Sequence, residues 1–341
     1  MMAARAAKGV VSKNQERLMS YAIRLYETGG PEKMRWEETA SRSPEPGEVL
    51  VRNTAVGLNF IDTYHRSGLY PVPLPTTLGV EGAGIVKSIG KKVTEFKTGD
   101  RVAFAGIPGA YAEEILCPSQ RLVKIPAGID DKVAAAIMLK GMTAWYLIRR
   151  TFKVKPGDTI LVHAAAGGVG QILCQWAKHL GATVIGTVGR DEKVALAKKA
   201  GCKHVIVTSK EKFVERVKAV TKGAGVPVVY DGVGKDTFMD SLDCLARRGL
   251  MVSFGNASGA VPPFNPGILA PKGSLFLTRP TLYDYTASRD ELLIAARELF
   301  ATIKNNAVKV AINQTYRLSE AAQAHRDVEA RKTTGSTVLL P

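Results

Sequence analysis

A strand, a glycine-rich turn and a helix follow one another within residues 160–179, and they restrict the fold more than any other feature. The apolar run 159–163 leads into a turn in which Ala165, Gly167 and Gly170 occupy the three glycine positions of G-x-G-x-x-G. The middle position lets the backbone approach a pyrophosphate, the last lets the helix pack closely on the strand, and the helix N-terminus supplies amides. In this setting the spacing predicts a dinucleotide-binding turn rather than a purely structural helix start.

Apolar runs alternate with helical patterns around this turn. The predicted strands after it are 183–188, 204–207, 227–231, 249–255 and 274–278, and the predicted helices are 171–179, 192–200, 212–221 and 236–246. Buried strands that alternate with helices are typical of right-handed crossovers in a parallel sheet covered on both faces. We therefore predict a doubly wound Rossmann domain.

The earlier part of the chain has short apolar runs separated by Gly and Pro. Strands are predicted at 21–27, 48–58, 83–90, 100–104, 112–117 and 121–126, which indicates a β-rich, barrel-like domain. Two late strands, 308–318 and 336–341, are assigned to the same domain, with helices at 289–303 and 319–331. The expected fold class is α/β, with a β-rich domain at 19–141 and 285–341 and the Rossmann domain at 142–284.

The end of the second Rossmann strand indicates which dinucleotide is bound. Proteins that bind NAD place Asp or Glu there, against the ribose hydroxyls. Here residues 187–190 read T-V-G-R, and Lys193 follows shortly after. Arg190 and Lys193 can form charge-assisted hydrogen bonds with a 2′-phosphate. NADPH is favoured, with a solvated helix start, and with Asp191 as a ribose ligand, as open alternatives.

Charge and cysteine content limit the other classes of function. The chain has 47 Lys and Arg against 31 Asp and Glu, a net charge of +16, which favours anionic ligands and allows weak nucleic-acid binding. No nucleic-acid motif accompanies the basic residues, which are spread along the chain. The cysteines at 117, 174, 202 and 244 are scattered, so we expect buried free thiols in the cytoplasm. No apolar run reaches the length of about 18 residues that a membrane span needs, so no membrane partner is expected.

Residues 1–18 contain four cations and a single acid, Glu16. A transit peptide and a disordered extension both fit this composition. Because Met19 begins a second plausible start, we expect an extension.

Five longer motifs follow one another along the chain. They are N-F-I-D-T-Y-H-R-S-G-L-Y-P at 59–71, L-G-V-E-G-A-G at 78–84, the glycine turn with its helix at 163–182, S-L-D-C-L-A-R-R-G-L-M-V-S-F-G-N-A-S-G-A at 241–260 and K-G-S-L-F-L-T-R-P-T-L at 272–282. Together they resemble the quinone oxidoreductase (NADPH:quinone reductase, zeta-crystallin-like) branch of the medium-chain dehydrogenase/reductase superfamily. The resemblance covers about residues 21–341. It implies a GroES-like catalytic domain, an active-site cleft beside the Rossmann domain, a homodimer, and reduction of quinones or other planar electrophiles by NADPH.

The resemblance also implies where the site residues lie. Asn59 and Tyr64 would face the nicotinamide, with Tyr70 along the substrate wall, and these three are the catalytic candidates. The implied cofactor contacts are Asn59, Thr143, Gly168, Val169, Phe254, Gly255, Asn256, Leu277, Thr278, Arg279 and Arg331, in addition to Ala165, Gly167, Gly170, Arg190 and Lys193. Thr208 stands where the family often has a tyrosine at the adenine end, so less stacking is expected there.

No metal site is expected. Zinc-dependent relatives use Cys, His and Glu ligands, often within Gly-His-Glu, whereas this chain reads G-V-E at 79–81 and has no cysteine near Asn59. Our hypothesis is that Tyr64 and Asn59 orient the acceptor oxygen and that Tyr64 or Tyr70 can donate a proton. Packing in the cleft is the alternative for both tyrosines.

Two other functions stay open. Sister branches use a zinc-free cleft of this kind to reduce α,β-unsaturated carbonyls with NADPH. Some zeta-crystallin relatives bind RNA, and a non-catalytic role of that kind has the net positive charge as its support.

Overall fold

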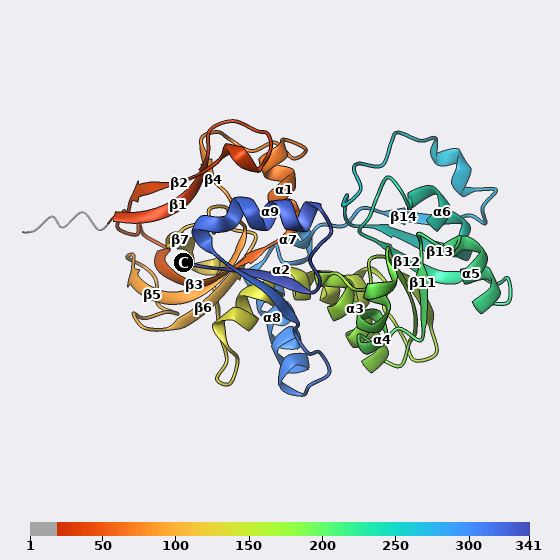
Figure 1. Cartoon of the computed structure of the whole chain (residues 1–341). Helices are drawn as coiled ribbons and strands as arrows, with labels where there is room; N and C mark the ends of the chain where they lie inside the picture. The colour runs from red at the N-terminus through yellow and green to blue at the C-terminus, as the bar shows by residue number, and fades with distance from the viewer. Residues whose placement is uncertain (1–18) are drawn as a thin grey trace, which may run out of the picture.

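The computed structural model describes residues 19–341, so the expected extension at 1–18 lies outside the described residues. The chain forms two lobes, and Figure 1 shows that one lobe contains both the early strands and the C-terminal end, while the other contains the middle of the chain. No helix within residues 19–341 combines the length and apolar character that crossing a bilayer requires.

The first lobe is built from two sheets. A three-stranded sheet has the order β2-β1-β4, and a seven-stranded sheet has the order β15-β16-β3-β5-β6-β8 with β7 paired to β3. The strands are β1 (Met19–Leu25), β2 (Met34–Ala40), β3 (Glu48–Leu58), β4 (Thr76–Thr77), β5 (Glu81–Ile89), β6 (Arg101–Ala105), β7 (Glu114–Pro118), β8 (Val123–Lys124), β15 (Ile312–Arg317) and β16 (Ser336–Leu340). The last strand pairs antiparallel with β3, so the C-terminal end of the chain joins the seven-stranded sheet formed by the early strands.

The alternating pattern does not predict two elements of this lobe. Strand β2 is polar along most of its length, and α1 (Phe60–Ser67) lies in a segment of β-rich texture. Asn59 is the N-cap of α1, and its backbone N–H donates to the Asp62 carboxylate at 2.8 Å; Gly68 is the C-cap, with φ 85°. These local caps form a helix in a segment for which no helix is predicted from the apolar pattern. Strand β15 also begins at Ile312 rather than at residue 308, as the run 308–318 predicts.

The second lobe contains the predicted parallel sheet. Its order is β11-β10-β9-β12-β13-β14, and every neighbouring pair is parallel. The strands are β9 (Thr159–Val162), β10 (Thr183–Val188), β11 (His204–Val207), β12 (Val226–Asp231), β13 (Leu245–Ser253) and β14 (Phe276–Thr278), with helices α3 (Gly168–His179), α4 (Val194–Lys199), α5 (Phe213–Val220) and α6 (Phe238–Asp243). This is the strand order of a Rossmann domain, and the prediction of a doubly wound sheet is confirmed.

One predicted helix of this lobe extends into a strand. The spacing predicts a helix to residue 246, but α6 ends at Asp243 and β13 begins at Leu245. Leu245 pairs with Val226, and Arg248 adopts φ 59° before the strand continues. Residues 245 and 246, which the spacing assigns to the helix, therefore belong to the irregular first part of β13.

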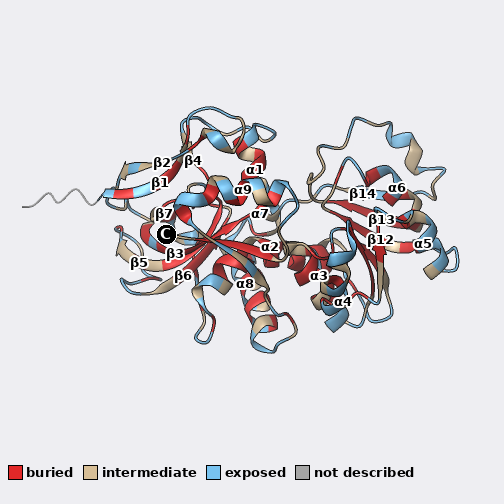
Figure 2. Cartoon of the chain, viewed as in Figure 1, coloured by how far each residue is buried: buried red, intermediate tan, exposed pale blue. Residues whose placement is uncertain are grey.

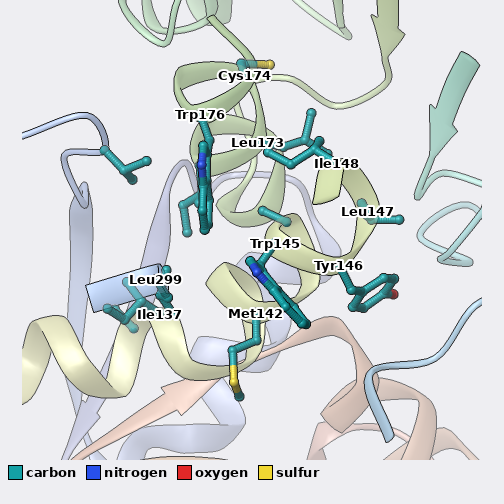
Figure 3. Close-up of a cluster of buried hydrophobic side chains, with 14 of the residues drawn as sticks. Ile137, Met142, Trp145, Tyr146, Leu147, Ile148, Leu173, Cys174, Trp176 and Leu299 are labelled. Atoms are coloured by element: carbon teal, nitrogen blue, oxygen red, sulfur yellow. The ribbon is translucent and has the colours of Figure 1, made fainter. Parts of the chain in front are cut away.

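Helix α2 (Asp131–Tyr146) connects the lobes. It packs against β3, β5 and β6 of the first lobe and against α3 and α8 (Arg289–Lys304), and the expected boundary after residue 141 falls inside it. Figure 3 shows Met142 and Trp145 of α2 in the same buried cluster as Trp176 of α3. In Figure 2 the buried residues concentrate in α2 and in the strands on either side of it. Helix α2 therefore contributes to a hydrophobic core that both lobes share.

All four cysteines are free and buried, as predicted.

Candidate active site between the two lobes

A cavity of about 1440 Å³ lies between the lobes. It opens at the carboxyl ends of the parallel strands, and its wall includes the residues that follow β9, β10, β12 and β13. In open parallel sheets, ligands bind where the strand order reverses, which is here between β9 and β12. Side chains of α1 and of α7 (Leu282–Tyr285) form the opposite wall, so a ligand in the cavity contacts both lobes.

The glycine turn forms the middle of the cavity wall. Gly167, Gly168 and Val169 line the cavity, and no side chain caps the N-terminus of α3. A Cβ on Gly170 would lie 2.3 Å from the carbonyl oxygen of Ala164, so only glycine allows this packing. The free amides at the N-terminus of α3 suit an anionic group.

Three cations gather at one end of the cavity. Arg190, Lys193 and Arg331 all line it, and burial together with the positive charges of both arginines lowers the pKa of Lys193. The Lys193 ammonium donates to the backbone oxygens of Arg331 at 3.0 Å and Thr333 at 3.3 Å, which connects β10 to the loop before β16. A cluster of like charges is stabilised by a bound anion, so this end fits a phosphate group.

Gly189 leaves room beside these cations. No atom lies within 4 Å of the position that a Cβ on Gly189 would occupy, and the residue lines the cavity at the end of β10. Together with the α3 amides, the space and the charges fit an extended phosphorylated dinucleotide.

Four side chains close the other end of the cavity by hydrogen bonds between the lobes. The Tyr64 hydroxyl accepts from the backbone N–H of Asn256 at 3.1 Å, and the Tyr70 hydroxyl accepts from Arg279 at 2.9 Å. With the amide oxygen of Asn256 turned toward Tyr70, the Tyr70 hydroxyl donates to it at 3.1 Å. Within residues 19–341 the Tyr64 hydroxyl hydrogen has no acceptor, and burial raises the pKa of Tyr64 to about 12.

A buried polar group forms the floor next to these tyrosines. The Asn59 amide donates to Glu81 at 2.8 Å and, at 3.4 Å, to the backbone oxygen of Gly57. The Lys140 ammonium lies 3.3 Å from the same carboxylate oxygen of Glu81. Asn59 and Lys140 line the cavity, whereas Glu81 lies behind them. The amide hydrogens of Asn59 are thus bonded within the protein.

The structure brings most of the predicted site residues to this one cavity. Those that line it are Asn59, Tyr64, Tyr70, Thr143, Gly167, Gly168, Val169, Gly170, Arg190, Lys193, Thr208, Phe254, Gly255, Arg279 and Arg331. They come from segments far apart in the sequence, which meet at the carboxyl edge of the sheet.

Four of the predicted cofactor contacts lie away from the cavity wall. Ala165 is fully buried below the turn, where its side chain faces Gly186. Asn256 is occupied with the two tyrosines. Leu277 and Thr278 lie in β14 at the edge of the sheet, and the first cavity residue after them is Arg279.

Sequence reasoning missed Lys140, which lies within the motif of Thr143 and in an apolar helix. A single lysine among buried residues of α2 is the signal that could have identified it, because lysine is rarely buried without a partner. Phe60 and Tyr283 also line the cavity and were not predicted. They add aromatic surface to the end closed by the tyrosines.

Comparisons with known proteins agree with this architecture. Residues 45–127 match the family of alcohol dehydrogenase GroES-like domains, and residues 168–298 match the zinc-binding dehydrogenase family. A quinone oxidoreductase of Pseudomonas aeruginosa is 54% identical over 95% of this chain and 100% of its own length. A 2-haloacrylate reductase of Burkholderia is 47% identical over 95% of this chain and 99% of its own length. The crystal structure of Escherichia coli quinone oxidoreductase complexed with NADPH has a TM-score of 0.93 and 50% identity, covering 94% of this chain and 100% of that one.

The second family name raises the question of a metal. Within residues 19–341, no three His, Cys, Asp or Glu side chains come together in a way that could hold a metal ion. At the position where Gly-His-Glu would supply a histidine, Val80 is buried in the first lobe.

Proposed function

The chain belongs to the quinone oxidoreductase family of the medium-chain dehydrogenase/reductase superfamily, and from this we propose that it reduces quinones with NADPH in the cleft between its lobes. The observation that carries the proposal is the continuous cavity. It runs from the cations Arg190, Lys193 and Arg331, past the glycine turn, to the aromatic end at Tyr64. A phosphorylated dinucleotide would extend along this path with its reactive ring beside a planar acceptor.

Each part of the wall would hold one part of the cofactor. The three cations would bind the 2′-phosphate, the amides of Gly168 and Val169 the pyrophosphate, and Phe254 the nicotinamide half. Bound NADPH supplies the hydride. The protein's contribution is to hold the acceptor against it and to exclude water, since positioning accounts for much of catalysis in such sites.

Tyr64 is the proton donor in this proposal. Its hydroxyl accepts from Asn256 and keeps its own hydrogen unshared within residues 19–341, whereas the Tyr70 hydrogen is directed to the Asn256 side chain. Burial raises the pKa of Tyr64 to about 12, so the hydroxyl stays protonated at neutral pH. Asn59 forms part of the wall at the nicotinamide end in this proposal, and its side-chain amide donates to Glu81.

The reduction of α,β-unsaturated carbonyls is the second candidate. The observation that favours it is the 47% identity with a 2-haloacrylate reductase over nearly the whole chain. In the same cavity an α,β-unsaturated carbonyl would accept a hydride at its β-carbon, and the enolate so formed would take a proton from Tyr64.

A screen of NADPH and NADH oxidation against ortho- and para-quinones and enals tests the proposal. We expect single-turnover rates with NADPH to be fastest for quinones. Faster enal reduction would favour the second candidate. Absence of NADPH binding would contradict both, and a preference for NADH would contradict the assignment of Arg190 and Lys193.

We also propose a homodimer that forms through the second lobe. Strand β14 is at the edge of the parallel sheet, and its Phe276 and Leu277 are 59% and 38% exposed. An edge strand with exposed apolar side chains is a template for pairing with another strand. A second copy of β14 offers the same surface about a two-fold axis.

A further inference from the structure

Lys140 is a buried cation that faces the cavity. It lies on α2, is 6% exposed, and lines the cavity together with Asn59 and the glycine turn. Within residues 19–341 its ammonium has one polar partner, Glu81, at 3.3 Å. An ammonium has three hydrogens, so two remain for a ligand.

Glu81 is held so that its charge is directed away from the cavity. One carboxylate oxygen accepts from the backbone N–H of Leu139 at 2.6 Å, and the other accepts from Asn59 at 2.8 Å and faces Lys140. The residue is fully buried and does not line the cavity. An acceptor in the cleft therefore meets the ammonium first, with the carboxylate behind it.

The stability of the fold does not by itself explain why Lys140 and Glu81 are buried as an ion pair. Removing two charges from water costs several kcal/mol per ion, and apolar residues of similar size are often as stabilising as a buried ion pair. Function gives a stronger reason, because a fixed charge in a water-poor site acts on developing charge far more effectively than it would in water.

We propose that the Lys140 ammonium, held in place by Glu81, stabilises the negative charge that develops on the acceptor oxygen during reduction. This inference rests on the proposed function and deepens it. Hydride addition to a quinone leaves the electron pair on a carbonyl oxygen, where the charge is balanced by Lys140. That oxygen then takes the proton of the Tyr64 hydroxyl, and the tyrosinate regains a proton from water. Glu81 is the positioning residue.

Three variants test the proposal on the full-length protein. Lys140→Met removes the cation, Lys140→Arg keeps it, and Glu81→Gln with Lys140→Met replaces the whole pair by neutral residues of similar size. We expect kcat to fall about 100-fold in Lys140→Met, as when one oxyanion donor is lost, with an NADPH dissociation constant within about 3-fold of wild type. Lys140→Arg should recover a large part of kcat.

The double variant separates function from folding. If the pair only supported the fold, the neutral pair would restore both the melting temperature and kcat, and the proposal would be overturned. We expect the melting temperature to recover and kcat to stay low. Across benzoquinones of increasing product basicity, the loss of kcat should grow, because a more basic oxygen gains more from the cation. A loss that is equal for all acceptors contradicts the proposal.

Two further outcomes remain distinguishable. The Lys140 side chain lies against Gly168 of the glycine turn. A large rise in the NADPH dissociation constant of Lys140→Met would therefore assign the ammonium to the cofactor and would overturn the inference. Wild-type protein in the same assay tests the proposed function separately, since failure to reduce any quinone would refute that function. Lys132→Met, an exposed change on the same helix, is the matched control and should leave kcat unchanged.

Discussion

Tyr64 and Tyr70 differ in whether the hydroxyl hydrogen is donated to another residue. Both hydroxyls accept a hydrogen bond from the second lobe, but only the Tyr70 hydroxyl has an acceptor for its own hydrogen, the Asn256 side chain, within the described part of the chain. Their ring centroids lie 5.1 Å apart, edge to face, so the contact between the rings does not distinguish the roles of the two tyrosines. Hydrogen bonding assigns them different roles.

Replacing Tyr64 with Phe should slow the chemical step. Loss of a positioned proton donor typically costs about 100-fold or more in rate, so we expect a fall of this order in kcat at pH 7. The NADPH dissociation constant should change little. Stopped-flow single-turnover measurements check this. Tyr21→Phe, which removes an exposed hydroxyl from β1, is the control. Full activity in Tyr64→Phe would assign Tyr64 to packing.

The cations at the other end should discriminate between NADPH and NADH. A hydrogen bond to a charged group contributes about 1.5–3 kcal/mol, so Arg190→Ala and Arg331→Ala should each weaken NADPH binding by about 10- to 100-fold. NADH binding should stay near its wild-type value, because NADH has no 2′-phosphate. Fluorescence titration with both nucleotides checks this. Lys198→Ala is the control, an exposed change on α4 away from the cavity. Equal losses for both nucleotides would contradict the assignment.

At the level of elements, two glycines of the cavity wall, Gly170 and Gly189, meet different requirements that single substitutions can separate. A Cβ on Gly170 would meet backbone atoms of Ala164 and Ala165, and backbone cannot move aside as a flexible side chain can. A Cβ on Gly189, which lines the cavity, would meet nothing within 4 Å. The first position allows α3 to pack against the turn that follows β9, and the second leaves space for a ligand.

Gly170→Ala should therefore destabilise the fold, and Gly189→Ala should not. Overpacking typically costs about 1–3 kcal/mol, so we expect a clear fall in the melting temperature of Gly170→Ala. Gly189→Ala should keep the wild-type melting temperature and weaken NADPH binding. Differential scanning fluorimetry with and without NADPH distinguishes the two. A wild-type melting temperature for Gly170→Ala would contradict the packing argument.

Helices α1 and α9 (Ala321–Glu329) are joined by a buried polar network. His325 is fully buried, accepts from Arg66 at 3.3 Å and contacts the Tyr111 hydroxyl at 3.1 Å. Burial, with the charge of Arg66, lowers the pKa of His325 to about 3. In the same network, burial raises the pKa of Asp62 to about 7. The two groups thus have opposite effects on stability as pH changes.

His325 should make the fold acid-sensitive. Its folded pKa lies below its unfolded pKa, so between them only the unfolded chain binds the proton, and stability falls as pH falls below about 6.5, by about 1.4 kcal/mol per unit. The free energy of unfolding of wild type relative to His325→Gln should drop by about 2 kcal/mol between pH 6.5 and pH 5. Urea unfolding measures this, and the comparison cancels the Asp62 contribution. A difference independent of pH would show that His325 is protonated alike in both states.

At the scale of the whole molecule, the core around α2 holds the two lobes of one copy together, whereas the open edge at β14 offers a surface to a second copy. The core packs α2 against elements of both lobes and supports the cleft between them. The edge strand β14 leaves Phe276 and Leu277 exposed. Assembly through β14 should therefore extend the parallel sheet into a second copy.

Phe276→Lys should convert the proposed dimer into a monomer. A charge at the centre of an apolar pairing surface is costly to bury and repels its copy across the two-fold axis. Sedimentation velocity should give a dimer mass for wild type and a monomer mass for the variant. Leu293→Lys on α8, which is also exposed, should remain dimeric. A monomeric wild type would refute the dimer.

The sequence alone determined the features that depend on neighbouring residues. The glycine turn, the strands around it and Arg190 at the end of β10 are local, because a turn or a strand end is defined by residues a few positions apart. Their predictions were accurate for β10 and β11, both of which have the expected bounds.

Contacts between distant residues were decided by the tertiary structure. Lys140 and Glu81 are 59 positions apart, and Tyr64 and Asn256 are 192 positions apart. Sequence patterns record which residues prefer burial, but not which buried cation meets which carboxylate, or which tyrosine keeps its hydrogen unshared. Those pairings arise only when the sheets bring the segments together, because hydrogen bonds and ion pairs act over a few ångströms in space.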